Sequence, residues 1–433
     1  MRAARGLAVL MVLMFSATSA MAAGFRLPEA GAKAMGMGFA FTAQADDPSA
    51  IYFNPAGILQ LEGTNFMAGV TYVKENGGDF TGITPLTAGA SVSETQKDLN
   101  FWIPNAYVTK KASPNFAYGV GTFAPFGLGQ EYQNRDTSIF RGQITKIDLQ
   151  TVVFNPTVAF KINDVLSVGA GIDFMYGKAK LAKTGNVAGV GNIFKLDLDG
   201  DGTAWGYNFG ALLVPSKNWK IGFSHRSPFS LDIKNGDVKI REINSTIPFV
   251  PGTGGPFTAA QVFGGTSFDT KGSTRLDMPA TTALGIAYIR DRLTIEVDLD
   301  WTWWSSYDAL NIDLQDNKVL LPDSNTRKDW KDVVALRIGG EYRVTDPLAL
   351  RLGFAYDPTP VPADTMGPEL PDASRLQYTA GAGYKYGNWV FDGSYMYIQK
   401  KDRSVSNISG TTGFNGEWKG SAHLVALDIG YKF

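Results

Sequence analysis

Apolar and polar residues alternate with a period of two through most of this chain. Between Leu293 and Trp303 the odd positions are Leu, Ile, Val, Leu, Trp and Trp, whereas the even positions are Thr, Glu, Asp, Asp and Thr. Residues 423–433 alternate in the same way and end on Phe433. Because successive side chains of a strand point to opposite faces, this period predicts β-strands with one apolar and one polar face. After residue 22 no apolar run approaches the roughly 18 residues that a membrane-spanning helix needs.

The composition of the two faces separates a soluble β-sandwich from a membrane barrel. The polar face of a sandwich looks at water and is rich in Lys, Thr and Ser, whereas here it carries Gly, Ala and mixed charges, as in a crowded closed interior. The apolar face carries aromatic residues such as Trp301, Tyr356 and Tyr431 towards strand ends. Such aromatic girdles are typical of lipid-facing barrels. We therefore predict an all-β, antiparallel transmembrane barrel, with Phe433 resembling the terminal assembly signal of outer-membrane barrels.

The first 22 residues have the features of a secretory signal peptide. Arg2 and Arg5 precede an apolar run at residues 6–15, and Ala20-Met21-Ala22 is a small-residue cleavage signal. The chain has 40 basic and 41 acidic residues and no cysteine. A balance so close to neutral, without a basic patch, gives no indication of nucleic-acid binding. The lack of cysteine excludes disulfides and thiolate metal sites.

Short and long connections between the predicted strands give the strand number. Six tight turns lie at residues 110–115, 161–166, 214–219, 289–293, 344–348 and 386–389. Seven longer polar stretches lie near residues 74–101, 125–147, 179–203, 235–270, 304–331, 358–375 and 400–418. Short periplasmic turns and long extracellular loops are the usual asymmetry of outer-membrane barrels. The pattern predicts 14 strands within residues 63–433.

Residues 23–62 do not alternate and contain three prolines. They are too apolar to stay solvated as a disordered tail. We expect them to fold as an N-terminal hatch that plugs the lumen, for which a barrel of 14 strands is wide enough. Within this segment Asn54, Pro55, Ala56 and Gly57 predict a tight turn, because Asn bonds nearby backbone and Pro fixes its own φ.

The third predicted strand, residues 116–132, contains Pro125 between pairs of glycines that include Gly127. Proline cannot donate to a β-ladder, and in a closed barrel there is no edge to accommodate it. Pro125 therefore predicts a local break in the wall. The alternative is that Pro125 only begins an extracellular loop.

No catalytic site is predicted. The two histidines, His225 and His423, share the parity of lipid-facing residues, where a base cannot serve a lumenal nucleophile. Residues 197–202 read DLDGDG and resemble the first half of a calcium loop, but the twelfth position is Asn208 where such a loop needs Glu. We interpret this stretch as an acidic loop tip, and no metal or cofactor is expected.

Several motifs together resemble the FadL family of outer-membrane transporters for long-chain fatty acids and aromatic hydrocarbons. The resemblance covers the mature chain and rests on residues 23–25, 46–47, 54–56, 102–108, 126–132, 205–213, 224–227, 304–310 and 357–363. It implies a 14-strand barrel with an N-terminal hatch, capture of ligand on apolar extracellular loops such as 247–265, and a deeper pocket beside the hatch. It also implies lateral release into the membrane through a wall gap at a kink, matched here by Pro125, Phe126 and Gly127.

The resemblance implies functional residues as well. In fatty-acid members two basic residues face the ligand carboxylate, and the nearest positions here are Lys183 and either Arg327 or Lys328. Phe126 is expected to contact the ligand, whereas Asn54, Pro55, Ala56 and Gly57 are expected to act in hatch gating. The alternative for the basic residues is that they are solvated loop charges.

The sequence thus predicts a multi-pass outer-membrane protein of a Gram-negative bacterium, monomeric and in contact with outer-membrane lipid. We expect passive, lateral-diffusion uptake of long-chain fatty acids or similar hydrophobic molecules. Two alternatives remain: uptake of monoaromatic hydrocarbons, and a surface adhesion or receptor barrel that uses its long loops. An aqueous porin is a further option.

Overall fold

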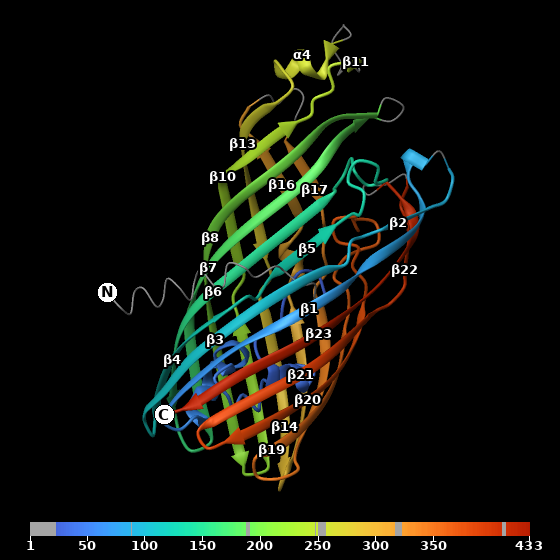
Figure 1. The fold of residues 1–433 in the computed structure, drawn as a ribbon. Helices are drawn as coiled ribbons and strands as arrows, with labels where there is room; N and C mark the ends of the chain where they lie inside the picture. Colours follow the sequence, from blue (N-terminus) through green and yellow to red (C-terminus); the bar gives the residue numbers. More distant parts are fainter. Residues whose placement is uncertain are drawn as a thin grey trace.

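Fourteen antiparallel strands form a closed barrel (Figure 1). The computed structural model describes residues 23–433 except 88, 188–190, 247, 250–256, 317–322 and 409–412, so the signal peptide predicted at residues 1–22 lies outside the described residues. Pairing of the first wall strand with the last closes the barrel. Around the wall the strands are β1 (Thr64–Ile83), β3 (Leu99–Ser113), β4 (Phe116–Phe123), β6 (Lys146–Lys161), β7 (Leu166–Val187), β8 (Gly191–Ser216), β9 (Trp219–Arg226), β14 (Thr281–Arg290), β15 (Leu293–Thr302), β18 (Val333–Arg343), β19 (Leu348–Asp357), β20 (Arg375–Tyr386), β21 (Trp389–Lys400) and β23 (Asn415–Lys432).

Further elements lie towards the end opposite the tight turns, and β11 and β12 form a separate sheet there (Figure 1). They are β2 (Val92–Thr95), β5 (Gly127–Glu131), β10 (Phe229–Arg241), β11 (Pro248–Phe249), β12 (Phe257–Thr258), β13 (Phe268–Met278), β16 (Ala309–Leu314), β17 (Ser324–Arg327), β22 (Arg403–Ser406), η2 (Pro85–Thr87), α4 (Ala259–Phe263) and η3 (Trp304–Ser306). Within the described part of the chain, no helix has the length and apolarity to cross a membrane. The predicted strand number is confirmed, since each tight turn joins two neighbouring wall strands.

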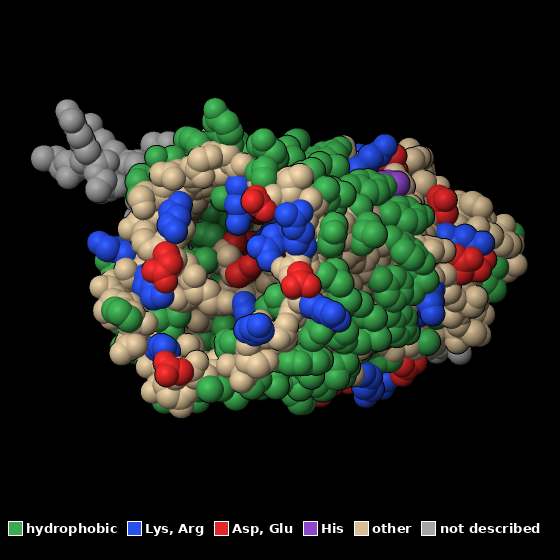
Figure 2. Space-filling view, turned by 90° about the horizontal axis from the view of Figure 1, so that it is seen from below, with side chains coloured by type: hydrophobic (Ala, Val, Ile, Leu, Met, Phe, Trp, Pro, Cys, Tyr) green, Lys and Arg blue, Asp and Glu red, His purple; other side chains and the backbone are tan. Residues whose placement is uncertain are grey.

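The two faces of each strand meet different surroundings, as the alternation predicts. On β14, Leu284 and Ile286 are exposed on the outer face, whereas the next residue, Ala287, points inward and is buried. Figure 2 views the molecule from the end with the tight turns. It shows apolar side chains covering the outer wall and charged side chains gathered around the mouth. The outer face thus suits a lipid environment.

Residues 23–62, called the N-terminal segment below, lie inside the lower part of the barrel. Their short helices are α2 (Ala32–Gly36), α3 (Ala50–Phe53) and η1 (Pro55–Gln60). The inward wall face carries glycine where this segment touches it. A Cβ on Gly169 would lie 2.5 Å from the carbonyl carbon of Pro55, and one on Gly222 would lie 2.1 Å from the carbonyl oxygen of Thr42. The small residues noted on the polar face therefore admit the backbone of the segment.

Two carboxylates of β15 hold the N-terminal segment through its backbone. Asp298 Oδ2 accepts hydrogen bonds from the N–H groups of residues 41 and 42, at 3.0 and 2.9 Å. The two oxygens of Glu296 accept from residues 43 and 44, at 2.6 and 2.8 Å. Both side chains are buried. Charged residues on the inward face of β15 thus bind four consecutive amides, and hydrogen bonds to charged groups are among the stronger ones in proteins.

The double substitution Glu296→Ala with Asp298→Ala leaves these four amides without acceptors. We expect hydrogen exchange at residues 41–44 to accelerate at least about tenfold, because a hydrogen bond to a charged group contributes roughly 1.5–3 kcal/mol. The measurement is amide exchange followed by mass spectrometry on the purified barrel. Asp201→Ala, on the outer face, is the control and should leave this exchange unchanged. Equal exchange in the double variant and the parent protein would contradict the anchoring role.

Candidate functional site: an apolar cavity beside a break in the wall

The wall is interrupted between β4 and β5. Both strands pair with β6, but residues 124–126 between them stand opposite only residues 151 and 152 of β6. The interruption therefore contains one extra residue, as in a β-bulge. Pro125 lies at its centre, and β5 continues the strand beyond it. Pro125 thus sits within the interrupted wall strand and does not begin an extracellular loop.

The same interruption separates β3 from β5. β3 pairs with β4 only as far as Ala106, and within the described residues its stretch 99–105 pairs only with β1 on the other side. Contact resumes where the N–H of Lys97 donates to the carbonyl oxygen of Glu131, at 2.8 Å. We call this region, residues 99–105 and 124–126, the wall break.

Hydrogen bonds to the wall break come from inside the barrel. The N–H of Leu27 donates to the carbonyl oxygen of Pro125 at 2.8 Å, and that of Gly127 donates to the carbonyl oxygen of Phe25 at 2.9 Å. The Thr151 hydroxyl donates to the carbonyl oxygen of Phe126 at 2.6 Å and lies 3.2 Å from its N–H. The first residues of the N-terminal segment thus cover the break and satisfy backbone groups that the ladder leaves unpaired.

An apolar cavity of about 70 Å³ lies next to this covered break. It is bounded by the start of the N-terminal segment, by the upper parts of β5 to β8, and by the connections around β16 and β17. The lining residues are Phe25, Leu128, Ile147, Asp148, Leu149, Ala179, Lys180, Leu181, Leu198, Thr274, Leu276, Tyr307, Leu310, Ile312, Lys328, Trp330, Glu369 and Leu370. Ligand pockets usually measure roughly 300–1,000 Å³, so a long acyl chain fits only after lining groups move.

Aromatic rings form one side of the cavity. The ring of Phe25 lies 4.7 Å from that of Trp304 and 5.5 Å from those of Tyr307 and Trp330. Burial, together with the nearby Glu369 carboxylate, raises the pKa of the Tyr307 hydroxyl, which stays neutral at ordinary pH. Such a cluster offers ring faces and edges to an apolar ligand.

The polar residues of the lining include an ion pair between the buried Lys328 and the half-buried Glu369. The side chain of Lys328 is only 5% exposed. Arg327, immediately before it, is 54% exposed and pairs with Asp364 at 2.7 Å. Of the two basic residues that the sequence left as alternatives, Lys328 therefore lies at the cavity, and Arg327 faces away from it. The β17 strand ends at Arg327, which allows the chain to turn Lys328 inward.

The other two predicted ligand residues do not line the cavity. Lys183 lies on β7 two residues beyond the lining residue Leu181, and no carboxylate of a described residue forms an ion pair with it. Phe126 is buried behind the lining residue Phe25, and the centroids of these two rings are 6.0 Å apart. Of the capture loop expected at residues 247–265, residues 247 and 250–256 lie outside the described residues, and the rest includes β11, β12 and α4.

The Asn54–Gly57 turn joins α3 to η1 and anchors both to the wall. The Asn54 side chain donates to the carbonyl oxygens of Thr42 and Ala211, at 2.8 and 3.0 Å, and its Oδ1 accepts from the N–H of Ala56. Pro55 is the first residue of η1, where its missing N–H costs nothing. A Cβ on Gly57 would lie 2.3 Å from the carbonyl oxygen of Ala45, so no larger residue fits. None of these four residues lines the cavity.

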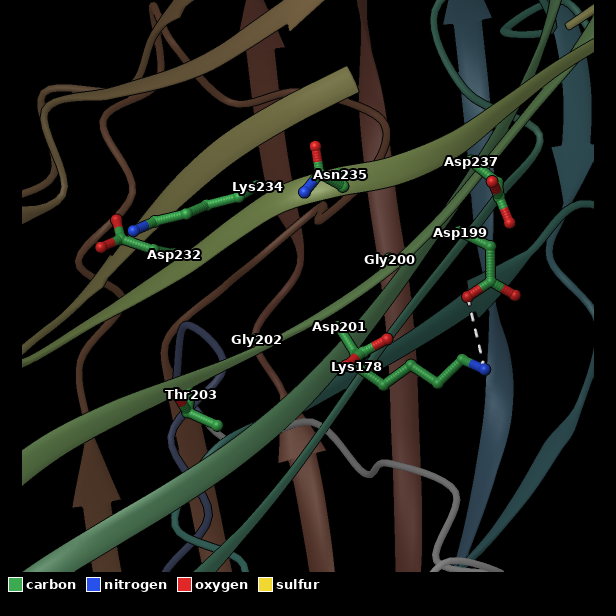
Figure 3. Close-up of a pocket in the computed structure, with 10 residues that line it drawn as sticks. All are labelled: Lys178, Asp199, Gly200, Asp201, Gly202, Thr203, Asp232, Lys234, Asn235 and Asp237. Carbon is green, nitrogen blue, oxygen red and sulfur yellow. Dashed lines mark ion pairs between the residues drawn. The ribbon is translucent and has the colours of Figure 1, made fainter. Parts of the chain in front are cut away.

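The DLDGDG stretch lies within β8, so the loop tip expected from its composition is wrong. It continues the ladder between β7 and β10 and borders an open hollow of about 730 Å³ on the outer face (Figure 3). Asp199 pairs with Lys178 there, at 3.4 Å, and the remaining carboxylates are spread along the hollow. Across the described residues, no group of three or more His, Cys, Asp or Glu side chains could hold a metal ion.

Sequence patterns did not indicate several of the residues that form the cavity. Glu369 and Leu370 belong to a long connection without periodicity, residues 358–374, and Trp330 follows a short extension strand. Trp304 and Tyr307 stand in a motif that carried the family resemblance, but nothing in their spacing placed them beside Phe25. Residues that are far apart in the sequence and meet only in the folded chain leave no local pattern in the sequence.

Comparison with known proteins identifies the family to which the chain belongs. A model described as outer membrane protein transport protein (OMPP1/FadL/TodX) matches residues 13–433. A long-chain fatty acid transport protein of Escherichia coli O6:H1 is 27% identical, and outer membrane protein P1 of Haemophilus influenzae is also 27% identical. The alignments cover 96% and 97% of both chains, respectively.

Solved structures show the same fold. A Pseudomonas aeruginosa FadL homologue has a TM-score of 0.77 at 20% identity and covers 95% of this chain and 100% of its own. The Pseudomonas putida toluene transporter TodX has a TM-score of 0.67 at 17% identity, with 94% and 99% covered. With nearly its whole length matched, the chain belongs to the OMPP1/FadL/TodX family of outer-membrane transport proteins, which are channels and not enzymes.

Proposed function

We propose that this channel takes up long-chain fatty acids or similar amphiphiles by passive lateral diffusion. The observation that carries the proposal is an apolar cavity that holds one buried lysine and adjoins a covered break in the wall. A cation at the edge of an apolar site suits a molecule with an anionic head and a long apolar tail. Membership of a family of hydrophobic-compound channels supports the same class of substrate.

In the proposed path the ligand leaves sideways. It binds first on the extracellular loops and then in the cavity, next to Phe25 and Leu128. Displacement of the first residues of the N-terminal segment uncovers the wall break, and the ligand passes into the hydrocarbon layer. An apolar tail then never crosses water on its way out of the lumen.

The N-terminal segment acts in this proposal as the hatch. Its later part is tied to β15 by Glu296 and Asp298 and to β8 by Asn54. Asn54, Pro55, Ala56 and Gly57 serve closure and do not touch the ligand head group. The absence of these four residues from the cavity lining supports this assignment.

Uptake of monoaromatic hydrocarbons is the second candidate. The cavity is small, and the rings of Phe25, Tyr307 and Trp330 line one side of it, with Trp304 packed behind them. An uncharged ring compound has no head group that needs a polar partner, so it can bind among these rings and leave the Lys328–Glu369 pair intact. TodX, a toluene transporter, has the same fold.

Replacement of Lys328 separates the two candidates. In Lys328→Met we expect the affinity for oleate to fall about ten- to hundredfold, because a charge-assisted hydrogen bond contributes roughly 1.5–3 kcal/mol. The double variant Lys328→Met with Glu369→Gln removes both charges together and should bind oleate as weakly, without leaving a buried charge unpaired. Toluene affinity should not change. Binding is measured by titration of the purified barrel in detergent.

Arg327→Gln is the matched control, since this neighbour is exposed and paired outside the cavity. It should bind oleate like the parent protein. Undiminished oleate affinity in the two Lys328 variants would contradict the fatty-acid assignment, and toluene binding would then favour the hydrocarbon candidate.

Deletion of Pro125 tests the lateral route. It removes the extra residue, so that residues 124 and 126 stand opposite 152 and 151 and the ladder with β6 becomes continuous. We expect uptake by whole cells to fall at least about tenfold, while oleate binding to the purified protein persists. Pro125→Ala keeps the extra residue and should retain uptake. Normal uptake in the deletion variant would exclude the wall break as the exit.

A further inference from the structure

The ion pair at the cavity has a feature that the proposed uptake function does not use. The ammonium group of Lys328 is already paired with the Glu369 carboxylate, and both residues line the cavity. A lone buried ammonium group is strongly destabilising, so an apolar cavity that contains a lysine needs a counter-ion whenever no anionic ligand is present. The Glu369 carboxylate has the same chemistry as the head group of a fatty acid.

Glu369 belongs to a connection that packs over the cavity. In this connection the Thr365 hydroxyl donates to the carbonyl oxygen of Lys328 at 2.5 Å, and the carbonyl oxygen of Pro368 accepts from the Tyr132 hydroxyl at 2.9 Å. Leu370, the next residue after Glu369, is itself part of the lining. Displacement of the Glu369 carboxylate therefore disturbs the connection at the cavity.

The same connection also holds the first described residues of the N-terminal segment. Asp372, three residues after Glu369, accepts a hydrogen bond from the N–H of Gly24 at 3.2 Å. Asp372 is buried and is fixed on its other oxygen by Arg375. Gly24 directly precedes Phe25, whose carbonyl oxygen accepts a hydrogen bond from the N–H of Gly127, the residue next to the wall break. A continuous chain of contacts thus joins Glu369 to the cover of the break.

We propose that Glu369 is an internal counter-ion that an anionic ligand replaces, and that this exchange loosens the cover of the wall break. The inference rests on the proposed uptake of fatty acids and adds to it a positioning residue that senses the head group. When a carboxylate ligand binds Lys328, Glu369 moves away, and residues 364–372 release Gly24 and Phe25. An uncharged hydrocarbon fills the apolar part of the cavity, leaves the ion pair intact and does not trigger the release.

Gly367 provides a way to move the carboxylate without removing its charge. A Cβ at this position would lie 1.9 Å from Glu369 Oε2, and the flexible end of a side chain gives way to such a contact. Gly367→Ala therefore displaces Glu369 from its present place. Glu369→Gln removes the charge and keeps the shape. The two variants perturb the counter-ion by different means.

The first readout compares an acid with its alcohol. We expect Glu369→Gln and Gly367→Ala in the full-length barrel to bind oleate more tightly than the parent protein, by about tenfold, since the internal competitor is lost or displaced. Oleyl alcohol, which does not pair with Lys328, should bind all proteins alike. The control is Asp364→Asn, which alters an exposed ion pair on the same connection.

The second readout is amide hydrogen exchange in residues 24–30. In the parent protein oleate should accelerate this exchange and oleyl alcohol should not. In Glu369→Gln and Gly367→Ala the exchange should be fast without ligand and insensitive to oleate. A residue with only a structural role would not change the difference between acid and alcohol.

The outcomes separate this inference from the function on which it rests. Weak oleate binding by Lys328→Met, combined with parent-like affinity and parent-like exchange in both counter-ion variants, overturns the inference alone. Parent-like oleate binding by Lys328→Met overturns the head-group assignment and the inference together. Tighter oleate binding with ligand-independent exchange in both counter-ion variants supports the inference.

Discussion

Every strand of this barrel must meet one requirement: its backbone N–H and C=O groups need hydrogen-bond partners where no water is available. A closed wall of 14 strands meets it, because the pairing of β1 with β23 removes the sheet edges. The wall break between β3 and β5 is the exception. It persists because Phe25, Leu27 and the Thr151 hydroxyl supply partners from inside the barrel. The N-terminal segment thus fills the lumen and also completes the hydrogen bonding of the wall.

This dependence divides the N-terminal segment into two parts. Residues 41–60 are held by buried carboxylates of β15 and by the Asn54 amide on β8. Residues 24–27 instead bind the break through backbone hydrogen bonds and meet Asp372 of a loop. Residues 24–27 can therefore move without the unfolding of residues 41–60. In the proposed lateral path, the opening in the wall changes while residues 41–60 stay bound to β15 and β8.

The sequence predicted those features that leave a local pattern. Alternation and turn spacing gave the strands, because each strand must show one face to lipid and one to the lumen. Pro125 indicated the break, since proline lacks the donor that a ladder needs. The cavity was out of reach of such reasoning, because Phe25, Trp304, Lys328 and Glu369 meet only after the barrel closes. The acidic stretch in β8 failed for a related reason: its composition suits a loop, but the neighbouring strands extend the ladder through it.

In the proposed path, ligand leaves through the wall break when the start of the N-terminal segment moves. Arg26 and Phe126 form an isolated antiparallel bridge between the two, in the non-hydrogen-bonded geometry whose short Cα separation suits a disulfide. The chain has no cysteine of its own, so Arg26→Cys with Phe126→Cys gives a single reversible lock. Oleate uptake should stop in the oxidised double variant and return on reduction, with each single variant insensitive to oxidant. Undiminished uptake by the fully cross-linked protein would exclude the wall break as the exit.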